Sequence, residues 1–181
     1  MVQLLKGGEP YKMSKRAGNV ILMSDITEEI GADALRFIFL TRKSDTHLEF
    51  DIDMLKNQDS SNPIFYINYA HARINQVFVK AEINYDDIRD VSFEELNQDG
   101  LNLVYEALLL ESVLVEAFSK RDMQKITEYL YNLASSVHKF YNEHKVIGSS
   151  EQNVYLKVLA IAALSINVGL SLLGIKAKEI M

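Results

Sequence analysis

The sequence predicts an all-α helical bundle that follows a short α/β segment. The 181 residues include only two prolines and eight glycines, which leaves little loop material and favours long helices. Apolar side chains recur at helical spacing through most of the chain, as at Ile67, Ile74 and Phe78. Hydrophobic residues make up 48% of the chain, which is enough to bury a full core. Residues 2–22 differ, because two short apolar runs flank a glycine-containing loop there.

The N-terminal third is expected to alternate short elements. "VQLL" and "NVILM", within residues 2–22, are predicted as strand-like or irregular. Ser24 or Asp25 can cap a short helix that Gly31 ends, because glycine readily adopts the left-handed conformation at a helix C-terminus. "DALRFIFLTR" follows with the spacing of a buried helix face, and "HLEFDID" alternates as an extended segment before a brief helix at "MLKNQ".

The remaining two thirds are expected to form the principal helices. Asn62 is a good N-cap, and Pro63 at the first helical position loses no hydrogen bond. "LNLVYEALLLESVLVEAF" is apolar nearly all round and predicts a central helix. Two further helices are expected within residues 122–148 and 150–174. The sequence therefore predicts four or five long helices after the N-terminal segment.

Composition narrows the class of protein. The net charge of −6 argues against indiscriminate coating of nucleic acid, but acid is concentrated in residues 85–99, so a local basic face remains possible elsewhere. Zero cysteines exclude disulfides and thiolate metal sites, which suits the cytoplasm. The apolar run over residues 158–175 approaches membrane-span length, but Ser165, Asn167 and Gly169 interrupt it. We expect a packed bundle helix there, with no membrane partner and no metal site.

The stretch "KMSKR", Lys12 to Arg16, carries the chemistry of a phosphate-binding loop. Two ammonium groups lie three residues apart, with a hydroxyl between them, on a loop flanked by glycine. Such a loop can close on a polyphosphate whose negative charge grows as a bond breaks. A solvated basic turn is the alternative for any Lys-x-x-Lys. The full string resembles KMSKS, the second signature of class I aminoacyl-tRNA synthetases, with Arg16 in place of the last serine.

Further motifs resemble arginyl-tRNA synthetases along essentially the whole chain. They are "GADALRFIFLTRKSDTHLEFD", "NPIFYINYAHARI", "EYLYNLASSVHKFYNEHKVIG" and the terminal "LLGIKAKEIM". The resemblance implies that residues 1–30 are the C-terminal end of a Rossmann-type catalytic domain with its KMSKS-type loop. It implies that residues 31–181 are a helical anticodon-binding domain of the DALR type, named after the motif at 33–36. Arginine, ATP and arginine tRNA are the implied partners, and we expect a monomer.

The resemblance also assigns roles in ATP chemistry. Lys15 would be the principal pyrophosphate ligand and Lys12 its helper, while Met13, Ser14 and Arg16 complete the ATP-binding loop. ATP and Mg²⁺ would be held mainly by an upstream catalytic domain. The first class I signature, His-x-Gly-His, surrounds none of the four histidines. We therefore expect a C-terminal portion that does not activate arginine by itself.

Recognition of an unpaired base requires an aromatic or guanidinium plane and hydrogen bonds to the base edge. Arginine anticodons share a middle cytosine. Tyr69, Arg73, Tyr141 and Met181 match the positions that build the pocket for that base in the resembled enzymes. Lys145, expected one helical turn after Tyr141, is a candidate phosphate contact.

Other interpretations remain open at this point. The chain could come from another class I synthetase with a DALR domain, such as a cysteinyl or glycyl relative, or it could be a non-catalytic helical interaction module. On periodicity alone Tyr66 and Tyr69 also suit the edge of a core. His71 and Arg73 could simply make polar contacts between packed helices, and Arg36 suits a structural ion pair or an interface. The six-residue separation of His138 and His144 does not suit a metal site.

Overall fold

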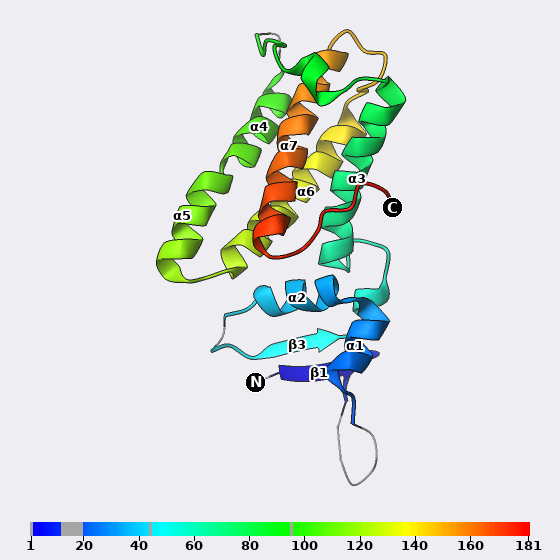
Figure 1. Ribbon diagram of the computed structural model, residues 1–181, viewed down its shortest axis with the longest axis vertical. Helices are drawn as coiled ribbons and strands as arrows, with labels where there is room; N and C mark the ends of the chain where they lie inside the picture. Colours follow the sequence, from blue (N-terminus) through cyan, green and yellow to red (C-terminus); the bar gives the residue numbers. More distant parts are fainter. Residues whose placement is uncertain (1, 12–19, 44, 95) are drawn as a thin grey trace.

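A computed structural model describes residues 2–11, 20–43, 45–94 and 96–181. It consists of an elongated helical bundle that stands on a small unit of sheet and short helices (Figure 1). The predicted phosphate-binding residues, 12–16, lie outside the described ranges. The predicted fold class, a helical bundle after a short α/β segment, is confirmed.

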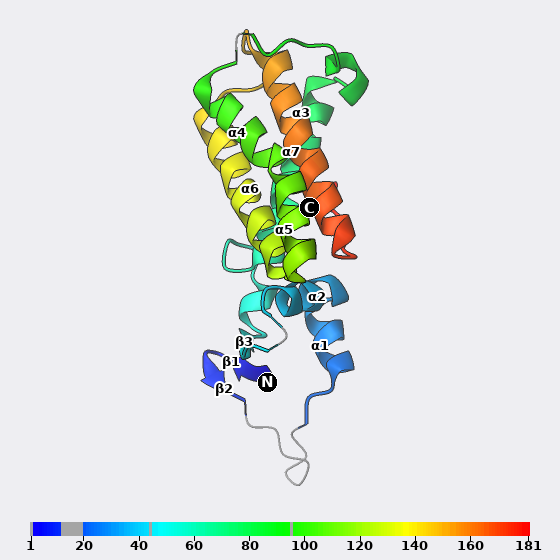
Figure 2. The ribbon, with the colours of Figure 1, turned by 90° about the vertical axis from the view of Figure 1, so that its left-hand side faces the viewer.

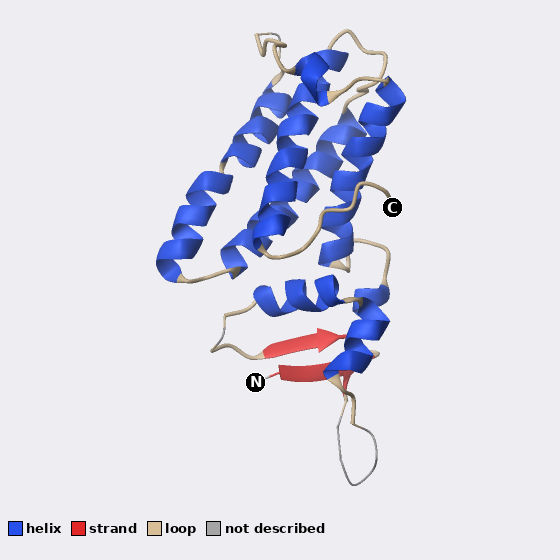
Figure 3. Cartoon of the chain, viewed as in Figure 1, coloured by secondary structure: helices blue, strands red, loops and turns tan. Residues whose placement is uncertain are grey.

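The N-terminal unit contains three strands and two helices (Figure 3). Strand β1 (Val2–Lys6) lies between β2 (Glu9–Pro10), which is antiparallel to it, and β3 (Leu48–Asp51), which is parallel to it. Helices α1 (Met23–Ile30) and α2 (Ala32–Leu40) lie in the crossover between β1 and β3. The extended segments predicted at "VQLL" and "HLEFDID" are therefore confirmed.

The turn between β1 and β2 is built on Gly7 and Gly8. Their φ angles of 60° and 82° lie in the left-handed region that glycine enters without strain. Two carboxylates, one at the end of β3 and one just after it, hold this turn: Gly8 N donates to Asp51 Oδ2 at 2.6 Å and Gly7 N to Asp53 Oδ2 at 3.1 Å. The hairpin and the third strand are thus fixed by side chains as well as by the ladder.

Helix α1 begins earlier than the sequence predicts. Its N-cap is Leu22, so Ser24 and Asp25 lie within the first turn and the predicted cap is wrong. Asp25 still serves the helix end, because its Oδ2 accepts the backbone N–H of Leu22 at 2.9 Å. Gly31, with φ of 84°, ends α1 as predicted.

A buried asparagine connects the N-terminal unit to the bundle. Asn62 caps α3 (Pro63–Ala81) by accepting from Phe65 N at 3.3 Å, as the sequence predicts. Its Nδ2 donates to the carbonyl of Leu55, in the short 3-10 helix η1 (Met54–Lys56), at 2.7 Å. One side chain therefore sets the start of α3 against the segment that follows β3.

The bundle is formed by α3 and four later helices. The short 3-10 helix η2 (Tyr85–Ile88) lies between α3 and the first of these. The later helices are α4 (Gln98–Leu108), α5 (Leu110–Lys120), α6 (Gln124–Glu143) and α7 (Gln152–Leu172). Helices α4 and α5 follow one another along one side, and α7 packs against α3, α4 and α6 (Figures 1 and 2).

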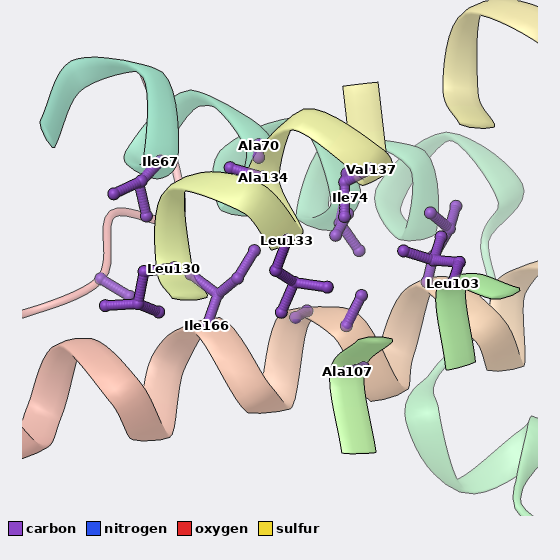
Figure 4. Packing of buried hydrophobic residues seen from close by; sticks show 14 of the residues in the cluster. Ile67, Ala70, Ile74, Leu103, Ala107, Leu130, Leu133, Ala134, Val137 and Ile166 are labelled. Carbon is purple, nitrogen blue, oxygen red and sulfur yellow. The ribbon is translucent and has the colours of Figure 1, made fainter. Parts of the chain in front are cut away.

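The bundle core is densely apolar. Figure 4 shows side chains of α3, α4, α6 and α7 pointing into one interior, where Leu130, Leu133 and Ile166 are at most 1% exposed. Helix α7 is long and apolar enough to span a membrane by composition alone, and 61% of that stretch is buried within the protein. Packing of α7 against three neighbouring helices accounts for its apolar character, as predicted for a bundle helix.

The helix predicted at the centre lies at the side instead. The run "LNLVYEALLLESVLVEAF" forms α4 and α5, which are interrupted at Leu109. Leu103, Ala107 and Ala117 face the core, whereas Phe118 is 87% exposed. The apolar composition predicted that this run is buried at the centre. The place of a helix in the bundle depends, however, on which of its faces pack against other helices, and α7 occupies the centre.

A second, smaller core lies between the sheet and the short helices. Its buried side chains are Leu4, Ile26, Leu35, Ile38, Leu48, Phe50, Ile52 and Leu55. Helix α2 contributes to both cores, with Leu35 and Ile38 facing the sheet and Ala34 and Phe37 facing the bundle. The domain division after residue 30 stays a prediction, while the small core itself extends to Leu55.

Candidate nucleic-acid interface

The structure brings together three of the predicted site residues, from α3 and α6. The guanidinium carbon of Arg73 lies 4.6 Å from the ring centroid of Tyr69 and 4.8 Å from that of Tyr141. Arg73 Nη2 also donates to the Tyr69 hydroxyl at 2.7 Å. Tyr69 and Arg73 are four residues apart on α3, so they share one helix face, and packing of α3 on α6 brings Tyr141 to the same place.

This arrangement, called the Tyr–Arg platform below, is accessible from outside. Tyr69 is 37% exposed, while Arg73 and Tyr141 are partly buried. A guanidinium over aromatic faces is stabilised by the ring quadrupoles, and both groups offer flat surfaces for stacking. The platform therefore combines a positive charge, hydrogen-bond donors and aromatic planes within one small area.

Aromatic neighbours support Tyr69. Its ring stacks on Phe65, with centroids 5.9 Å apart at 13°, and on His138, 5.5 Å apart at 28°. His138 is buried, and its Nε2 lies 3.2 Å from the carbonyl oxygen of Tyr66. Burial lowers the pKa of His138, and the nearby positive charge of Arg73 lowers it further. A neutral imidazole that donates through Nε2 to this carbonyl fits both observations.

Tyr66 has a supporting position rather than a place in the platform. Its ring packs on His138 at 4.4 Å and on Tyr131 at 5.3 Å. The contacts along α3 run through Phe65, Tyr69 and Arg73, which follow one another at four-residue spacing. The four-residue spacing from Phe65 was a signal visible in the sequence, whereas the contribution of His138 depends on the approach of α6.

The C-terminal tail, residues 173–181, crosses α3 (Figure 1). Two polar contacts hold it: Lys178 N donates to Asn68 Oδ1 at 3.0 Å, and His71 Nδ1 lies 2.9 Å from the Lys178 carbonyl oxygen. Both Asn68 and His71 are buried on α3. His71 therefore has the structural role that its position suggested.

Met181 ends this tail beside the aromatic surface. It lines a cavity of about 330 Å³ together with Phe65, the residue on which Tyr69 stacks. Its side chain is 40% exposed. The structure thus places Met181 near Phe65, on the side of α3 where Asn68 anchors the tail, and none of Tyr69, Arg73 and Tyr141 lines this cavity.

Lys145 lies apart from the helix on which it was expected. Helix α6 ends at Glu143, so the prediction that Lys145 lies one helical turn after Tyr141 is wrong. The backbone extends at His144, and Lys145 is exposed in the loop that follows. An exposed lysine beside the end of α6 retains the chemistry for a phosphate contact.

Among the described residues, one group of side chains lies close enough together to coordinate a metal ion. Asp99, Glu143 and His144 present oxygen and nitrogen atoms within 4.8 Å of one another, between the start of α4 and the end of α6. His144 Nε2 pairs with Asp99 Oδ2 at 3.2 Å, and both carboxylate residues are exposed. A surface pair between helix ends accounts for this geometry.

The sequence and the fold resemble those of known proteins. Residues 67–181 match the family described as DALR anticodon binding domain. All 181 residues align with the arginine–tRNA ligases of Aliarcobacter butzleri, at 88% identity, and of Campylobacter lari, at 60%. The chain covers 34% of the length of each of these relatives.

Solved structures of arginyl-tRNA synthetases also superpose on this chain. A Campylobacter jejuni protein described as an arginyl-tRNA synthetase superposes with a TM-score of 0.93 at 60% identity, over 100% of this chain and 40% of that chain. The Thermus thermophilus arginyl-tRNA synthetase shares the fold, with a TM-score of 0.76 at 20% identity, over 98% of this chain and 34% of that one. The chain therefore belongs to the DALR anticodon-binding domain family, and it corresponds to the C-terminal portion of arginyl-tRNA synthetases.

Proposed function

We propose that this chain reads the anticodon of arginine tRNA within an enzyme that joins arginine to that tRNA with ATP and Mg²⁺. The observation that carries the proposal is Arg73, held between the rings of Tyr69 and Tyr141 at a partly exposed site. The same combination of aromatic planes and a guanidinium suits an unpaired RNA base.

The middle cytosine of the anticodon fits this chemistry. A cytosine stacked on the exposed part of Tyr69 would gain about 1–3 kcal/mol, the usual range for a base on an aromatic side chain. Arg73 would donate to the carbonyl oxygen and ring nitrogen of the base, and Tyr141 would close the opposite side. Met181 would supply an apolar wall beside Phe65. Lys145 would contact a phosphate.

The rest of the reaction is assigned by resemblance to the relatives. Residues 1–30 would end a class I catalytic domain, and residues 31–181 would form the anticodon-binding domain. Lys15 and Lys12 would neutralise the departing pyrophosphate, with Met13, Ser14 and Arg16 completing the loop. The upstream catalytic domain would hold most of the ATP and Mg²⁺. We place the enzyme in the cytoplasm as a monomer.

Charging and binding assays on the full-length enzyme test the proposal. Arginine, and neither cysteine nor glycine, should be attached to tRNA. Filter binding should favour arginine tRNA over a non-cognate tRNA at each salt concentration, while both affinities fall as salt rises. Attachment of another amino acid, or equal binding of the two tRNAs, would refute it.

The matched variants are Arg73→Ala and Lys120→Ala, each of which removes one positive charge. Lys120 lies on α5, paired with Glu116 and away from the platform. Arg73→Ala should weaken binding of arginine tRNA about tenfold, while Lys120→Ala should leave it within about twofold. Unchanged affinity and rate in Arg73→Ala would remove this residue from the site.

A separate assay tests the division of labour along the enzyme. The 181-residue chain by itself should show no ATP–pyrophosphate exchange above background with arginine, because the groups proposed to bind the amino acid and the adenine lie upstream. ATP–pyrophosphate exchange that rises in proportion to the concentration of the 181-residue chain would contradict that division.

A further inference from the structure

Helix α2 is the one described helix that contributes buried side chains to both hydrophobic cores. Ala34 and Phe37 belong to the bundle core, while Leu35 and Ile38 belong to the core beneath the sheet. Two adjacent faces of one nine-residue helix are thus packed against different parts of the protein. A displacement of the sheet unit relative to the bundle must move α2.

The exposed side of α2 carries Arg36, which contacts the turn after α7. Arg36 Nη1 donates to the carbonyl oxygen of Gly174, 138 residues later in the sequence. The same side chain forms a longer ion pair, 3.7 Å, with Asp33 on its own helix. Arg36 therefore ties α2 to a single backbone group at the opposite end of the chain.

The carbonyl that Arg36 contacts lies where the C-terminal tail begins. Gly174 has φ of 70°, a conformation that turns the chain away from α7, and Ile175 N donates back to Leu170 O at 3.0 Å. A Cβ on Gly174 would lie 3.6 Å from Arg36 Nη1, so the guanidinium sits directly over this turn. The direction in which the tail leaves α7 is fixed there.

The tail carries this direction toward Phe65, the residue on which Tyr69 of the platform stacks. Ile175 and Ala177 are buried, and Lys178 is held by Asn68 and His71 of α3. Met181 then lines the cavity that Phe65 also lines. Only six residues separate Gly174 from Met181, and three of them, Ile175, Ala177 and Lys178, are buried or hydrogen-bonded to α3, so the tail has little freedom to absorb a shift at its start.

We propose that Arg36 is a positioning residue for tRNA recognition: it holds the turn at Gly174 so that the tail presents Met181 to the anticodon base. The inference rests on the proposed function, because it concerns the same base site. It also gives a physical route by which movement of the sheet unit, through α2, reaches that site. Arg36 itself touches neither the base nor the ATP.

The first test is hydrogen–deuterium exchange in the full-length enzyme without tRNA. Arg36→Ala should speed exchange at the backbone N–H groups of Ile175 and Lys178 about tenfold, because the turn that orders them loses its contact. Exchange at Leu133, in the bundle core, should not change. Arg36→Lys should restore part of the protection, since an ammonium group can also donate to a carbonyl. Unchanged tail exchange in Arg36→Ala would overturn the proposal.

The second test is a double-mutant cycle for binding of arginine tRNA. Deletion of residues 178–181 and Arg36→Ala should each weaken binding, Arg36→Ala by about fivefold. In the deleted enzyme, Arg36→Ala should have no further effect, because the residue acts through the tail. Multiplication of the two losses would overturn the proposal. Deletion of Met181 alone provides a milder version of the cycle.

The cycle separates this proposal from the one on which it rests. Failure of the wild-type enzyme to prefer arginine tRNA would refute the proposed function. A wild-type preference accompanied by independent effects of Arg36 and the tail would refute only the role of Arg36. Lys120→Ala, which removes a charge from α5, should behave as wild type in both experiments.

Discussion

The two hydrophobic cores differ in size and in how completely their side chains are buried. In the bundle, side chains from four helices surround Leu130, Leu156 and Ile166 so completely that none has measurable exposure. Beneath the three-stranded sheet, the best-buried side chains, Ile52 and Leu55, are each 3% exposed, and only eight residues form the core. A small sheet gains stability from the helix that covers it, so this unit depends on α2 more than the bundle does.

The difference explains why the candidate site lies on the bundle. Base recognition needs aromatic planes held in place before the base arrives. Tyr69 and Arg73 project from a 19-residue helix whose opposite face is buried, and His138 and Tyr141 project from a 20-residue helix packed against it. The sheet unit instead adjoins, in the sequence, the lysines proposed to neutralise the departing pyrophosphate.

The largest loss of stability is expected from truncating a buried side chain in the bundle core. Leu133→Ala should reduce the free energy of unfolding of the 181-residue chain by about 2–5 kcal/mol, because it leaves a cavity among α3, α6 and α7. Urea denaturation followed by circular dichroism at the helix band measures this. Leu164→Ala, at a 62% exposed position of α7, is the control and should cost far less. Equal losses would show that the described core is not the stabilising one.

A smaller effect is expected in the sheet unit. Phe50→Ala removes a buried ring that packs edge-on against Phe39, with centroids 6.2 Å apart. We expect the free energy of opening the sheet unit to fall by about 1–3 kcal/mol. The loss should appear mainly as local unfolding, because the sheet can open while the bundle stays folded. Hydrogen exchange should increase in β1 and β3 and remain unchanged at Leu133. A loss as large as that of Leu133→Ala, spread over both regions, would show that the two cores unfold as one.

The sequence predicts some elements of the bundle better than others. The start of α3 was predictable because Asn62 and Pro63 act locally, through a cap and a missing N–H. The central helix was not, because apolar residues such as Phe118 and Leu164 have the same composition signal as buried ones. Which of them is covered depends on the placement of other helices, and that information is not in a single segment.

A still smaller effect is expected at the junction of the two regions. Asn62→Ala removes the cap of α3 and leaves the Leu55 carbonyl without its donor, so the free energy of unfolding should fall by about 1–2 kcal/mol. Asn62→Asp retains the acceptor but not the donor, and it should recover part of the loss. Urea denaturation of the three proteins compares them. Identical stability of all three would mean that this junction does not tie the regions together.

The smallest effect is expected from titration of His138. Burial lowers its pKa in the folded chain below the ordinary value of 6.5, so between these two values the unfolded chain binds more protons. Stability should therefore be complete above pH 6.5, fall as pH drops through this window and level off below the folded pKa. His138→Gln should flatten this part of the pH profile, measured by thermal unfolding at constant ionic strength. An unchanged profile would contradict a buried neutral imidazole.

The geometry of the candidate site was predictable in part for the same reason as the fold. Tyr69 and Arg73 share a helix face, and their proximity follows from four-residue spacing. Their approach to Tyr141 and the support from His138 require α3 and α6 to pack, and no local pattern encodes that contact. Lys145 was misplaced because the end of α6 is set by a change of backbone at His144 rather than by the glycine four residues later.

Binding of two RNAs that differ only in the middle anticodon base tests the central proposal most directly. The full-length enzyme should bind arginine tRNA at least about tenfold more tightly than the same tRNA with that cytosine replaced by uracil, and Arg73→Ala should reduce this ratio to near unity. An enzyme that binds both RNAs equally, or an Arg73→Ala variant that keeps the full ratio, would contradict recognition of cytosine at the Tyr–Arg platform.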